Sequence, residues 1–401
     1  MIKITDLIVK KIIKNEFISI KIIVVLNNKF VGISLMPIES DIIYNNFYIK
    51  NIFNSLNLKA SMCIKFIKNV IYNNIVGKDP SLQYEIDNLL FLINKKFDNL
   101  FFKKIILTVS ISIARSYSNY KKIKLHELIS ELSNNNNNKK PNLILNIFNK
   151  NNKNILCNYL DIKNFMLELN SNIFLLENLY YINLIYKKLI NKLNKIYNKY
   201  LNINNKINSN IILYEINDLI YKSVLYNNNN INIGIDLSAS DLYNEHNDFY
   251  FLNEKNKVIS NCEFIEYIEN LLNMYSISYI ENSSHKYDWK LSYIQTEIFG
   301  NKLKLVGDSI FNNDLFLIEQ GIKHNICNSI LIKYYNMSTF SEIINICNLV
   351  KKYNYKIIIS NIFRDIDDLF FIDLALGISS DYIKIGYIYN FNLYKNLILN
   401  K

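Results

Sequence analysis

Three short apolar runs that each end in an acidic residue decide the fold: INIGID at residues 231–236, YSISYIE at 275–281 and LKLVGD at 303–308. Two further runs end in lysine, NSILIK at 328–333 and DYIK at 381–384. Each run is rich in β-branched or aromatic residues, and stretches with a helical spacing of apolar residues lie between most of them. This alternation predicts parallel strands joined by helices, as in a (β/α) barrel.

The last residues of these runs predict a shared site. In a (β/α) barrel the C-terminal ends of the strands surround one mouth, so residues far apart in the sequence meet there. Asp236, Glu281 and Asp308 would then lie together, with Lys333 and Lys384 beside them. Three carboxylates in one mouth repel each other unless a hard cation lies among them, and oxygen ligands of this kind suit Mg²⁺. The pattern therefore predicts a magnesium site.

Length and composition allow two domains and argue against several classes of protein. The chain has 401 residues, of which 50% are hydrophobic, enough for two sizeable cores. No apolar stretch has transmembrane length, and the first residues lack the cleavage site of a secretory signal. We therefore expect no membrane partner. The cysteines are odd in number, scattered and without a CxxC pair, so we expect reduced thiols and a cytoplasmic location. They are Cys63, Cys157, Cys262, Cys327 and Cys347.

The net charge of +11 raises the question of a nucleic-acid partner. Lysine is spread along the chain, as are Asn, Ile and Tyr, and all four residue types have AT-rich codons. Genome composition therefore explains much of the basicity, and no RRM, zinc-finger or OB signature accompanies it. We expect no nucleic-acid partner. We also expect two polar groups to be solvated, namely the four histidines (His126, His246, His285, His324) and the acidic loop Asp365, Asp367 and Asp368.

The chain divides into two expected domains. Residues 1–133 begin with two apolar runs joined across Asn27-Asn28, which predicts a β-hairpin, and continue with helical spacing up to about residue 132. Residues 134–140 are an Asn-rich linker, and residues 141–401 hold the strand–helix alternation. This order predicts an α+β capping domain followed by a (β/α) barrel.

The order and spacing of these segments resemble enolase (phosphopyruvate hydratase) over nearly the whole chain. The barrel segments that carry the resemblance are PNLILNIFN (141–149), IGIDLSASDLY (233–243), YSISYIENSSHKYDW (275–289), KLVGDS (304–309), ILIKYYNMSTFSE (330–342) and DYIKIG (381–386). In the expected cap, GKDPSLQYEID (77–87) and ILTVSISIAR (106–115) are similar to enolase segments.

The resemblance implies a fold, a reaction and roles for residues. It implies a capping domain, an enolase-type (β/α)8 barrel and a homodimer. The reaction would be the Mg²⁺-dependent, reversible dehydration of 2-phosphoglycerate to phosphoenolpyruvate in glycolysis. Asp236, Glu281 and Asp308 would bind the metal, and Glu281 and Asp308 would also contact the substrate. Lys333 would be the catalytic base and Lys384 would bind the substrate. Such a base removes a barely acidic proton, which metal ions make possible.

Two departures concern the phosphate and the lid. Enolases grip the phosphate with a Ser-His-Arg-Ser stretch, which here reads Ser360-Asn361-Ile362-Phe363, so an isoleucine replaces the bidentate arginine. Arg364 lies two positions further on. The mobile lid, Ser-Gly-Ala-Ser-Thr-Gly in the family, becomes residues 38–43, where Asp41 stands at the place of a serine ligand to a second metal.

Further departures concern proton transfer. The family's Gly-Asp-Glu-Gly-Gly loop supplies the general acid, whereas the stretch from Leu201 to Leu213 contains no carboxylate. A Phe-Gln-Glu-Phe segment becomes Ile162-Lys163-Asn164-Phe165, and a Gly-Gly-x-His loop becomes residues 150–153, KNNK. The aspartate that follows the third metal ligand in the family is Ser309 here. Losing a general acid typically lowers the rate by about two to four orders of magnitude.

Three functions stay open on these residues. The first is the enolase reaction itself, and the second is a non-catalytic enolase-like scaffold, which the missing acid and phosphate arginine favour. The third is a superfamily enzyme that acts on a carboxylate without phosphate, since metal ligands, base and one lysine suffice for that chemistry. Phosphate dependence of ligand binding would separate the two enzymes, and metal-independent association with a partner would favour the scaffold.

Overall fold

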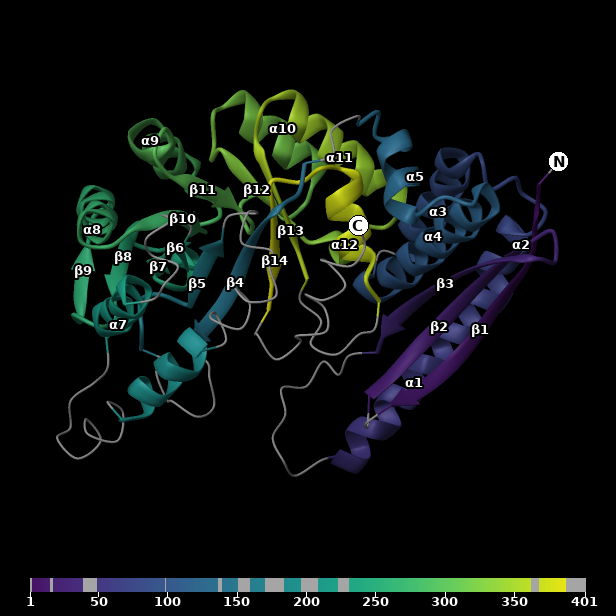
Figure 1. The fold of residues 1–401 in the computed structure, drawn as a ribbon, viewed down its shortest axis with the longest axis horizontal. Coiled ribbons are helices and arrows are strands. Elements are labelled where there is room, and N and C mark those ends of the chain that lie inside the picture. The colour runs from purple at the N-terminus through teal and green to yellow at the C-terminus, as the bar shows by residue number, and fades with distance from the viewer. Residues whose placement is uncertain are drawn as a thin grey trace. The chain divides into compact units, whose positions relative to one another are not determined.

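The computed structural model describes residues 2–14, 17–38, 49–97, 99–135, 139–150, 159–169, 184–195, 208–222, 231–361 and 368–386 (Figure 1). The chain forms two compact units. The first comprises Met1–Asn138, Lys333–Leu349 and Arg364–Ser379, and the second comprises Lys139–Ile332, Val350–Phe363 and Ser380–Lys401. The chain therefore returns to the first unit twice after leaving it.

The first unit opens with a three-stranded antiparallel sheet of β1 (Ile4–Lys14), β2 (Phe17–Leu26) and β3 (Phe30–Pro37). Strands β2 and β3 are joined across Asn27 and Asn28, which have φ values of 47° and 56°. Positive φ at both central residues is typical of a type I′ turn, and asparagine tolerates it. The predicted hairpin is confirmed, and β1 adds a strand that the sequence reading did not identify.

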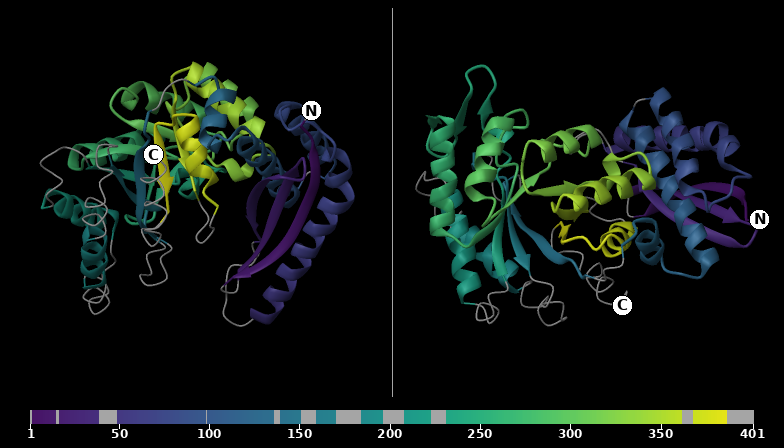
Figure 2. Two further views of the ribbon diagram at one scale, coloured as in Figure 1. Left: turned by 45° about the vertical axis from the view of Figure 1, so that its right-hand side comes forward. Right: turned by 90° about the horizontal axis from the view of Figure 1, so that it is seen from above.

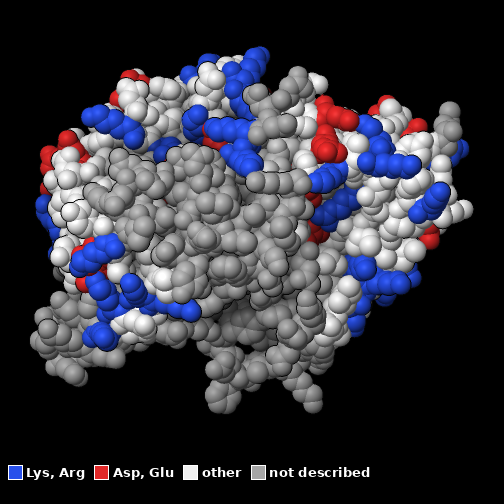
Figure 3. All heavy atoms as spheres, viewed as in Figure 1, with Lys and Arg blue, Asp and Glu red and all other residues white. Residues whose placement is uncertain are grey.

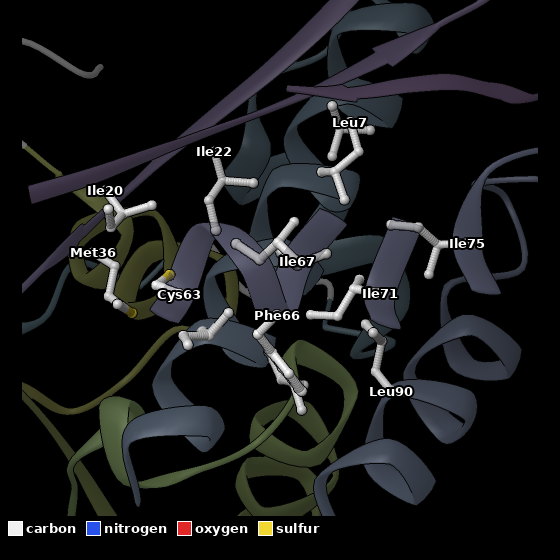
Figure 4. Packing of buried hydrophobic residues seen from close by; sticks show 14 of the residues in the cluster. Leu7, Ile20, Ile22, Met36, Cys63, Phe66, Ile67, Ile71, Ile75 and Leu90 are labelled. Atoms are coloured by element: carbon white, nitrogen blue, oxygen red, sulfur yellow. The ribbon is translucent and has the colours of Figure 1, made fainter. Parts of the chain in front are cut away.

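Helices cover one face of this sheet, and the predicted helical spacing up to residue 132 is confirmed. Figure 4 shows Leu7, Ile20 and Ile22 of the sheet facing side chains of the first helical stretch, including Cys63 and Ile67, in one buried cluster. The helices of this unit are α1 (Ile49–Phe66), π-helix η1 (Ile67–Ile71), α2 (Tyr72–Ile75), α3 (Gln83–Phe97), α4 (Leu100–Lys121), α5 (Leu125–Leu132), 3-10 helix η5 (Tyr334–Asn336), the first ten residues of α11 (Phe340–Lys352) and α12 (Phe370–Gly377).

A buried carboxylate joins three helices of the first unit. Asp87 of α3 is 2% exposed, and Oδ1 accepts a hydrogen bond from Ser110 of α4 at 2.6 Å. Oδ2 accepts from the backbone N–H and the hydroxyl of Ser341, at 2.8 and 2.6 Å. Because Ser341 lies in the first turn of α11, Asp87 satisfies an N–H group that has no partner inside the helix. Burial raises the pKa of Asp87, and the bonds from Ser110 and Ser341 oppose that shift.

A partly buried ion pair connects a later segment of the chain to the helix α4 of the first unit. Arg115 of α4 contacts both carboxylate oxygens of Asp368, at 2.9 and 2.6 Å, and also donates to the carbonyl of Ile33 at 2.7 Å. The Asp368 side chain is only 10% exposed. The expectation that Asp368 belongs to a solvated loop is therefore wrong. The arginine that buries it lies far away in the sequence and left no local signal. Asp365 and Asp367 lie outside the described residues.

The second unit is built on a closed eight-stranded barrel with the order β10-β11-β12-β13-β14-β4-β5-β6 (Figures 1 and 2). Its strands are β4 (Asn142–Asn149), β5 (Asn164–Leu169), β6 (Ile231–Asp236), β10 (Ile277–Glu281), β11 (Lys304–Gly307), β12 (Ser329–Ile332), β13 (Lys356–Ser360) and β14 (Tyr382–Ile385). The predicted fold class, an N-terminal α+β domain followed by a (β/α) barrel, is confirmed.

One barrel strand departs from the expected parallel pattern. Strand β5 runs antiparallel to both neighbours, β4 and β6. Its first residue, Asn164, therefore lies beside Asn149 and Asp236, which end the neighbouring strands. Residues at the start of β5, rather than at its end, consequently reach the mouth of the barrel.

The barrel interior is filled by large side chains, as in other closed eight-stranded rings. The buried cluster inside it consists of Ile144, Met166, Tyr279, Val306, Leu331, Ile358 and Tyr382. At the opposite end from the mouth, Lys304 Nζ lies 2.8 Å from Oε1 of Glu168, and Tyr382 also donates to Glu168. A partly exposed ion pair with a tyrosine therefore lies at the end of the ring opposite the mouth.

Helices and a small sheet connect the strands of the ring. The helices are α7 (Ser209–Tyr221), residues 184–195, 3-10 helix η4 (Ala239–Asp241), α8 (Asn261–Met274), α9 (Trp289–Phe299) and α10 (Leu315–Lys323). The sheet consists of β7 (Tyr243–Asn244), β8 (Phe249–Leu252) and β9 (Lys257–Ile259). No helix in the described parts of the chain is long and apolar enough to cross a membrane. Four cysteines, Cys63, Cys262, Cys327 and Cys347, are free thiols.

The charged side chains are distributed rather than separated by sign. On the face drawn in Figure 3, Lys and Arg side chains are spread over the described surface, with Asp and Glu between them. Exposed ion pairs among the described residues include Lys139 with Asp381 at 3.1 Å and Lys257 with Glu263 at 2.9 Å. Because such exposed pairs contribute little to stability, their main effect is to offset part of the positive charge locally.

Candidate active site

The three predicted metal carboxylates lie at neighbouring strand ends. Asp236 is the last residue of β6, Glu281 is the last residue of β10, and Asp308 directly follows β11. Strand β10 pairs with both β6 and β11, and Glu281 lies opposite Asp236 in the register. Parallel neighbours lie about 4.8 Å apart, so the three side chains start from adjacent positions on one rim.

Lys384 supplies positive charge to this group. It lies in β14, and its Nζ is 2.8 Å from Oε1 and 2.6 Å from Oε2 of Glu281. The side chains of Glu281 and Lys384 are 1% and 13% exposed. Because β14 and β10 are not neighbours in the ring, the contact crosses the barrel mouth. The structure thus brings Lys384 and Glu281 together from 103 residues apart in the sequence.

Asn282 joins the other two carboxylates. Its Nδ2 lies 3.2 Å from Oδ1 of Asp236 and 3.5 Å from Oδ2 of Asp308. Its Oδ1 accepts from the backbone N–H of Ser309 at 3.0 Å and from the Ser309 hydroxyl at 2.8 Å. Asn282 has a φ of 48°, a conformation that asparagine tolerates better than most residues. Sequence reasoning missed it, although its place directly after Glu281 could have suggested it.

Asn164 also contacts Asp236, whose Oδ1 in addition accepts from the backbone N–H of Ser238 at 3.0 Å. Asn164 is buried, and its Nδ2 donates to Oδ2 of Asp236 at 2.8 Å. This is the position at which the enolase segment has glutamate. The structure therefore shows that the position faces the carboxylates. An amide neither donates nor accepts a proton in acid–base catalysis, so Asn164 offers a hydrogen bond to Asp236 and no titrating group at this position.

Burial and mutual charge shift the ionisation of the central pair. Burial raises the pKa of Glu281 most, Asp236 and Asp308 raise it further, and Lys384 opposes the shift. For Lys384, burial lowers the pKa, but the three carboxylates raise it by more, so its pKa lies above the usual value. Lys384 therefore keeps its proton, and its positive charge offsets part of the negative charge of the three carboxylates.

A buried tyrosine contacts the same glutamate from inside the barrel. Tyr279 is 0% exposed, and its hydroxyl donates to Oε1 of Glu281. Burial raises the pKa of Tyr279, and the charge of Glu281 adds to that shift, so the hydroxyl keeps its proton. Sequence reasoning missed this residue. The available signal was its spacing, since residues i and i−2 of a strand point to the same face.

Lys333 directly follows Ile332, the last residue of β12, and precedes the 3-10 helix η5. By its contacts it belongs to the first compact unit. Within the second unit the structure therefore shows two neighbouring groups of contacts, Glu281 with Lys384 and Asp236 with Asp308 through Asn282, whose charges act on each other. Lys333 lies at a strand end of the same ring. The role of Lys333 as a base stays a prediction.

Two lysines lie at the rim beside Asn164. Lys150 follows β4 and Lys163 precedes β5, and their Nζ atoms are 3.8 and 3.7 Å from Oδ2 of Asp241. Lys163 also donates to the hydroxyl of Ser238 at 3.1 Å. Two lysines share one carboxylate here, so Lys150, Lys163 and Asp241 together carry an excess of positive charge. Lys150 and Lys163 lie in the two stretches that replace the Gly-Gly-x-His loop and the Phe-Gln-Glu-Phe segment of enolases, and the sequence alone gave them no role.

His285 is buried, although the sequence predicted a surface histidine. It is 3% exposed, its ring stacks on Tyr243 with 4.5 Å between centroids, and its backbone N–H donates to Oη of Tyr250 at 3.0 Å. Its Nε2 lies 3.3 Å from Oε1 of Glu245. The expectation of a surface histidine is therefore wrong. The tyrosines that cover it come from β7 and β8, so its charged sequence neighbours gave a misleading signal.

Several residues of the sequence analysis lie outside the described residues. They are Ile362, Phe363 and Arg364, residues 39–43 of the expected lid including Asp41, residues 151–153, residues 201–207, and Cys157. The interpretations that rest on them stay predictions.

The chemistry of the carboxylate group fits a hard divalent cation, because three side chains with oxygen donors come from adjacent strand ends on one rim. Within the described ranges, however, no three Asp, Glu, His or Cys side chains approach closely enough to share one ion. Lys384 contacts Glu281, and Asn282 bridges Asp236 and Asp308 instead. The donor set therefore fits Mg²⁺, and binding would require these side chains to exchange their present partners.

A comparison with known families agrees with this geometry. The family model described as enolase, C-terminal TIM barrel domain, matches residues 139–392, which is more than half of the chain. The matched region contains all eight barrel strands and each of the five predicted site residues. The chain therefore belongs to the enolase superfamily.

Proposed function

We propose that this protein is an enolase-type lyase that interconverts 2-phosphoglycerate and phosphoenolpyruvate with Mg²⁺. The observation that carries the proposal is the network at the barrel mouth, where Asp236, Glu281 and Asp308 come from adjacent strand ends and Lys384 contacts Glu281. Removing a proton next to a carboxylate requires concentrated positive charge and a base. The chain supplies candidates for both.

Each residue has a role in this proposal. Asp236, Glu281 and Asp308 would hold Mg²⁺, which, when bound, supplies Lewis-acid stabilisation of the charge that develops on the substrate carboxylate. Lys384 would contact the carboxylate end of the substrate. Lys333, in its neutral form, would accept the proton from the carbon next to that carboxylate. Departure of hydroxide needs a proton from another group, and the amide of Asn164 cannot supply it.

The rim lysines support an anionic substrate. Lys150 and Lys163 share the carboxylate of Asp241, so together they carry excess positive charge next to Asn164. A phosphate would find cationic groups there although isoleucine stands at the family's arginine position. Lysine interacts with phosphate as a point charge and lacks the bidentate fork of arginine, so the expected affinity is lower.

A second candidate is the same proton abstraction on a carboxylate without phosphate. Two observations favour it. Asn164 replaces a carboxylate that the full dehydration uses, and Arg115, the one arginine among the described residues, is held by Asp368 in the first unit. An enzyme that only abstracts the proton next to a carboxylate needs the metal ligands and a base, and those residues are present.

The test separates the two candidates. Purified protein with excess Mg²⁺ is incubated with 2-phosphoglycerate in D₂O, and formation of phosphoenolpyruvate and exchange at the α-carbon are followed by NMR. Turnover that vanishes in the Lys333→Ala variant supports the lyase. Exchange without phosphoenolpyruvate, or exchange only on unphosphorylated hydroxy acids, supports the second candidate. Protein indistinguishable from Lys333→Ala with all substrates would sink both.

By the same resemblance we propose that the protein is a cytoplasmic homodimer. Light scattering coupled to size-exclusion chromatography tests the dimer, since a monomer of this chain has a mass of 47.4 kDa. A monomeric mass at micromolar concentration would contradict the proposal.

A further inference from the structure

Tyr279 occupies a position that neither the proposed reaction nor the family resemblance assigns. It lies on β10 two residues before Glu281, so both side chains project to the same face of the strand. That face is the barrel interior, where Tyr279 belongs to the buried cluster with Met166 and Val306. Its ring is therefore enclosed in the barrel interior, and its hydroxyl donates to Glu281 at the end of the same strand.

The neighbouring strand is built to accept this ring. Gly234 of β6 lies directly opposite Tyr279 in the register. A Cβ atom at Gly234 would lie 3.1 Å from Cδ1 and 3.5 Å from Cβ of Tyr279. A contact of 3.1 Å is tighter than the usual van der Waals separation, so any larger residue at this position would have to push the ring aside. The absence of a side chain at Gly234 and the bulk of Tyr279 are thus complementary.

The hydroxyl of this fixed ring donates to Oε1 of Glu281, which is 1% exposed. Lys384 contacts both oxygens of the same carboxylate from across the mouth. A carboxylate on a glutamate has three rotatable bonds, and Lys384 is itself a flexible partner. The rigid contact comes from Tyr279, whose side chain has few degrees of freedom and is packed inside the ring.

We propose that Tyr279 is a positioning residue that orients the Glu281 carboxylate for binding a divalent cation. The inference rests on the proposed function, because it takes Glu281 as a metal ligand. Groups that hydrogen-bond to metal ligands fix their orientation, and their loss typically weakens metal binding by about 10- to 100-fold. The Tyr279→Phe variant keeps the ring in its enclosure and removes only the hydroxyl, so it isolates this effect.

Tyr382 provides a matched control. It lies in the same interior cluster, and its hydroxyl donates to a carboxylate as well, that of Glu168. Glu168, however, lies at the opposite end of the barrel, where it pairs with Lys304. The Tyr382→Phe variant therefore loses a buried tyrosine–carboxylate hydrogen bond inside the same barrel without touching the mouth.

The experiment is a titration of the full-length protein with Mn²⁺, followed by the EPR signal of the free ion, with thermal unfolding recorded for each variant. We expect Tyr279→Phe to raise the Kd about 10- to 100-fold, and Tyr382→Phe to leave it within about twofold of the wild type. Gly234→Ala keeps the hydroxyl but crowds the ring, so we expect it to weaken binding too. If Tyr279→Phe does not fold, the Mn²⁺ affinity of Gly234→Ala tests the positioning role of Tyr279 instead.

The outcomes are distinguishable. Wild-type affinity in Tyr279→Phe, or equal losses in Tyr279→Phe and Tyr382→Phe, would overturn the positioning role while leaving the proposed function intact. If Tyr279→Phe is unfolded, wild-type affinity in Gly234→Ala would overturn it. Wild-type protein that binds no Mn²⁺ would overturn the proposed metal site first, and the role of Tyr279 with it.

Discussion

Lys384 and Glu281 form an ion pair that is almost fully enclosed, and such pairs are costly to break from one side. Removing one partner of a buried pair leaves an uncompensated charge and typically costs about 3–5 kcal/mol, whereas removing both together costs less. The pair at the lower end of the barrel, Lys304 with Glu168, offers a comparison with the same residue types.

We therefore expect Lys384→Met to lower the free energy of unfolding by about 3 kcal/mol, and Glu281→Gln in the same chain to recover most of the loss. Urea denaturation at pH 7 measures this. The double-mutant cycle at Lys304 and Glu168, where the lysine side chain is 22% exposed, is the comparison for a more exposed pair in the same barrel, and we expect a smaller loss there. A Lys384→Met variant as stable as the wild type would contradict the enclosure of Glu281.

Asp161 gives a pH prediction at the same scale. It is 1% exposed, and its Oδ1 accepts from the backbone N–H of Asn253 at 2.7 Å. Burial and the nearby charge of Glu254 raise the pKa of Asp161 from 3.8 to about 7. The folded protein therefore keeps a proton that the unfolded chain releases near pH 4. The stability that this group contributes is present below pH 4 and is lost as the pH rises to about 7.

The Asp161→Asn variant keeps the Oδ1 acceptor but cannot ionise. We expect its stability relative to the wild type to rise between pH 4 and pH 7, by an amount on the order of a few kcal/mol. Denaturant unfolding of both proteins at several pH values tests the difference. A difference that stays constant, or that falls with rising pH, would show that Asp161 does not carry the raised pKa.

At the scale of elements, one carboxylate determines how α11 begins. Asp87 accepts from Ser110 of α4 and from two groups of Ser341 in the first turn of α11. We expect Asp87→Ala to leave these buried donors without partners and to cost several kcal/mol, since each such group costs about 1–3 kcal/mol. Asp79→Ala is the matched control, because Asp79 accepts from Ser81 at an exposed site. Equal stability of both variants in urea would contradict this reading.

The elements also show what the sequence could and could not predict. The strands ending at Asp236 and Glu281 were predictable, because a short run of adjacent apolar residues is enough to indicate a buried strand. The Asn27-Asn28 hairpin was predictable for the same reason. The reversed direction of β5 was not, since pairing direction depends on the neighbours, β4 and β6. Asn282 was missed as a site residue because its partners, Asp236 and Asp308, come from neighbouring strand ends. Tyr279 was missed although its partner lies two residues along the same strand, because the run of apolar residues does not show which face of the strand is the barrel interior.

At the scale of the whole molecule, the first unit is not made from one continuous stretch. Arg115 pairs with Asp368, and Asn135 donates to the carbonyl of Gly377 at 2.9 Å. A Cβ atom at Gly377 would lie 2.5 Å from Cβ of Ile129, so α12 is closely packed on α5. Residues that follow the barrel strands β12 and β13 are thus part of the core of the first unit.

A fragment of residues 1–138 should therefore not fold as it does in the full chain. It lacks Ser341, Asp368 and α12, which leaves Asp87 and Arg115 without their buried partners. We expect it to show helical circular dichroism without a cooperative thermal transition and to bind a hydrophobic dye. The full-length protein is the control. A fragment that unfolds cooperatively, at a temperature close to that of the full chain, would contradict this prediction.

The closure of the ring has a consequence for how the protein is made. Strand β14 pairs with β4, so Tyr382 lies beside Asn142, and β14 is the last barrel strand along the chain. The hairpin of β4 and β5 forms between near neighbours, whereas this final pairing must close a loop that contains the rest of the barrel. Until β14 has been synthesised, the barrel is an open sheet with two unpaired edges. Such edges favour association between chains, so slow translation of the last segment would increase aggregation more than slow translation elsewhere.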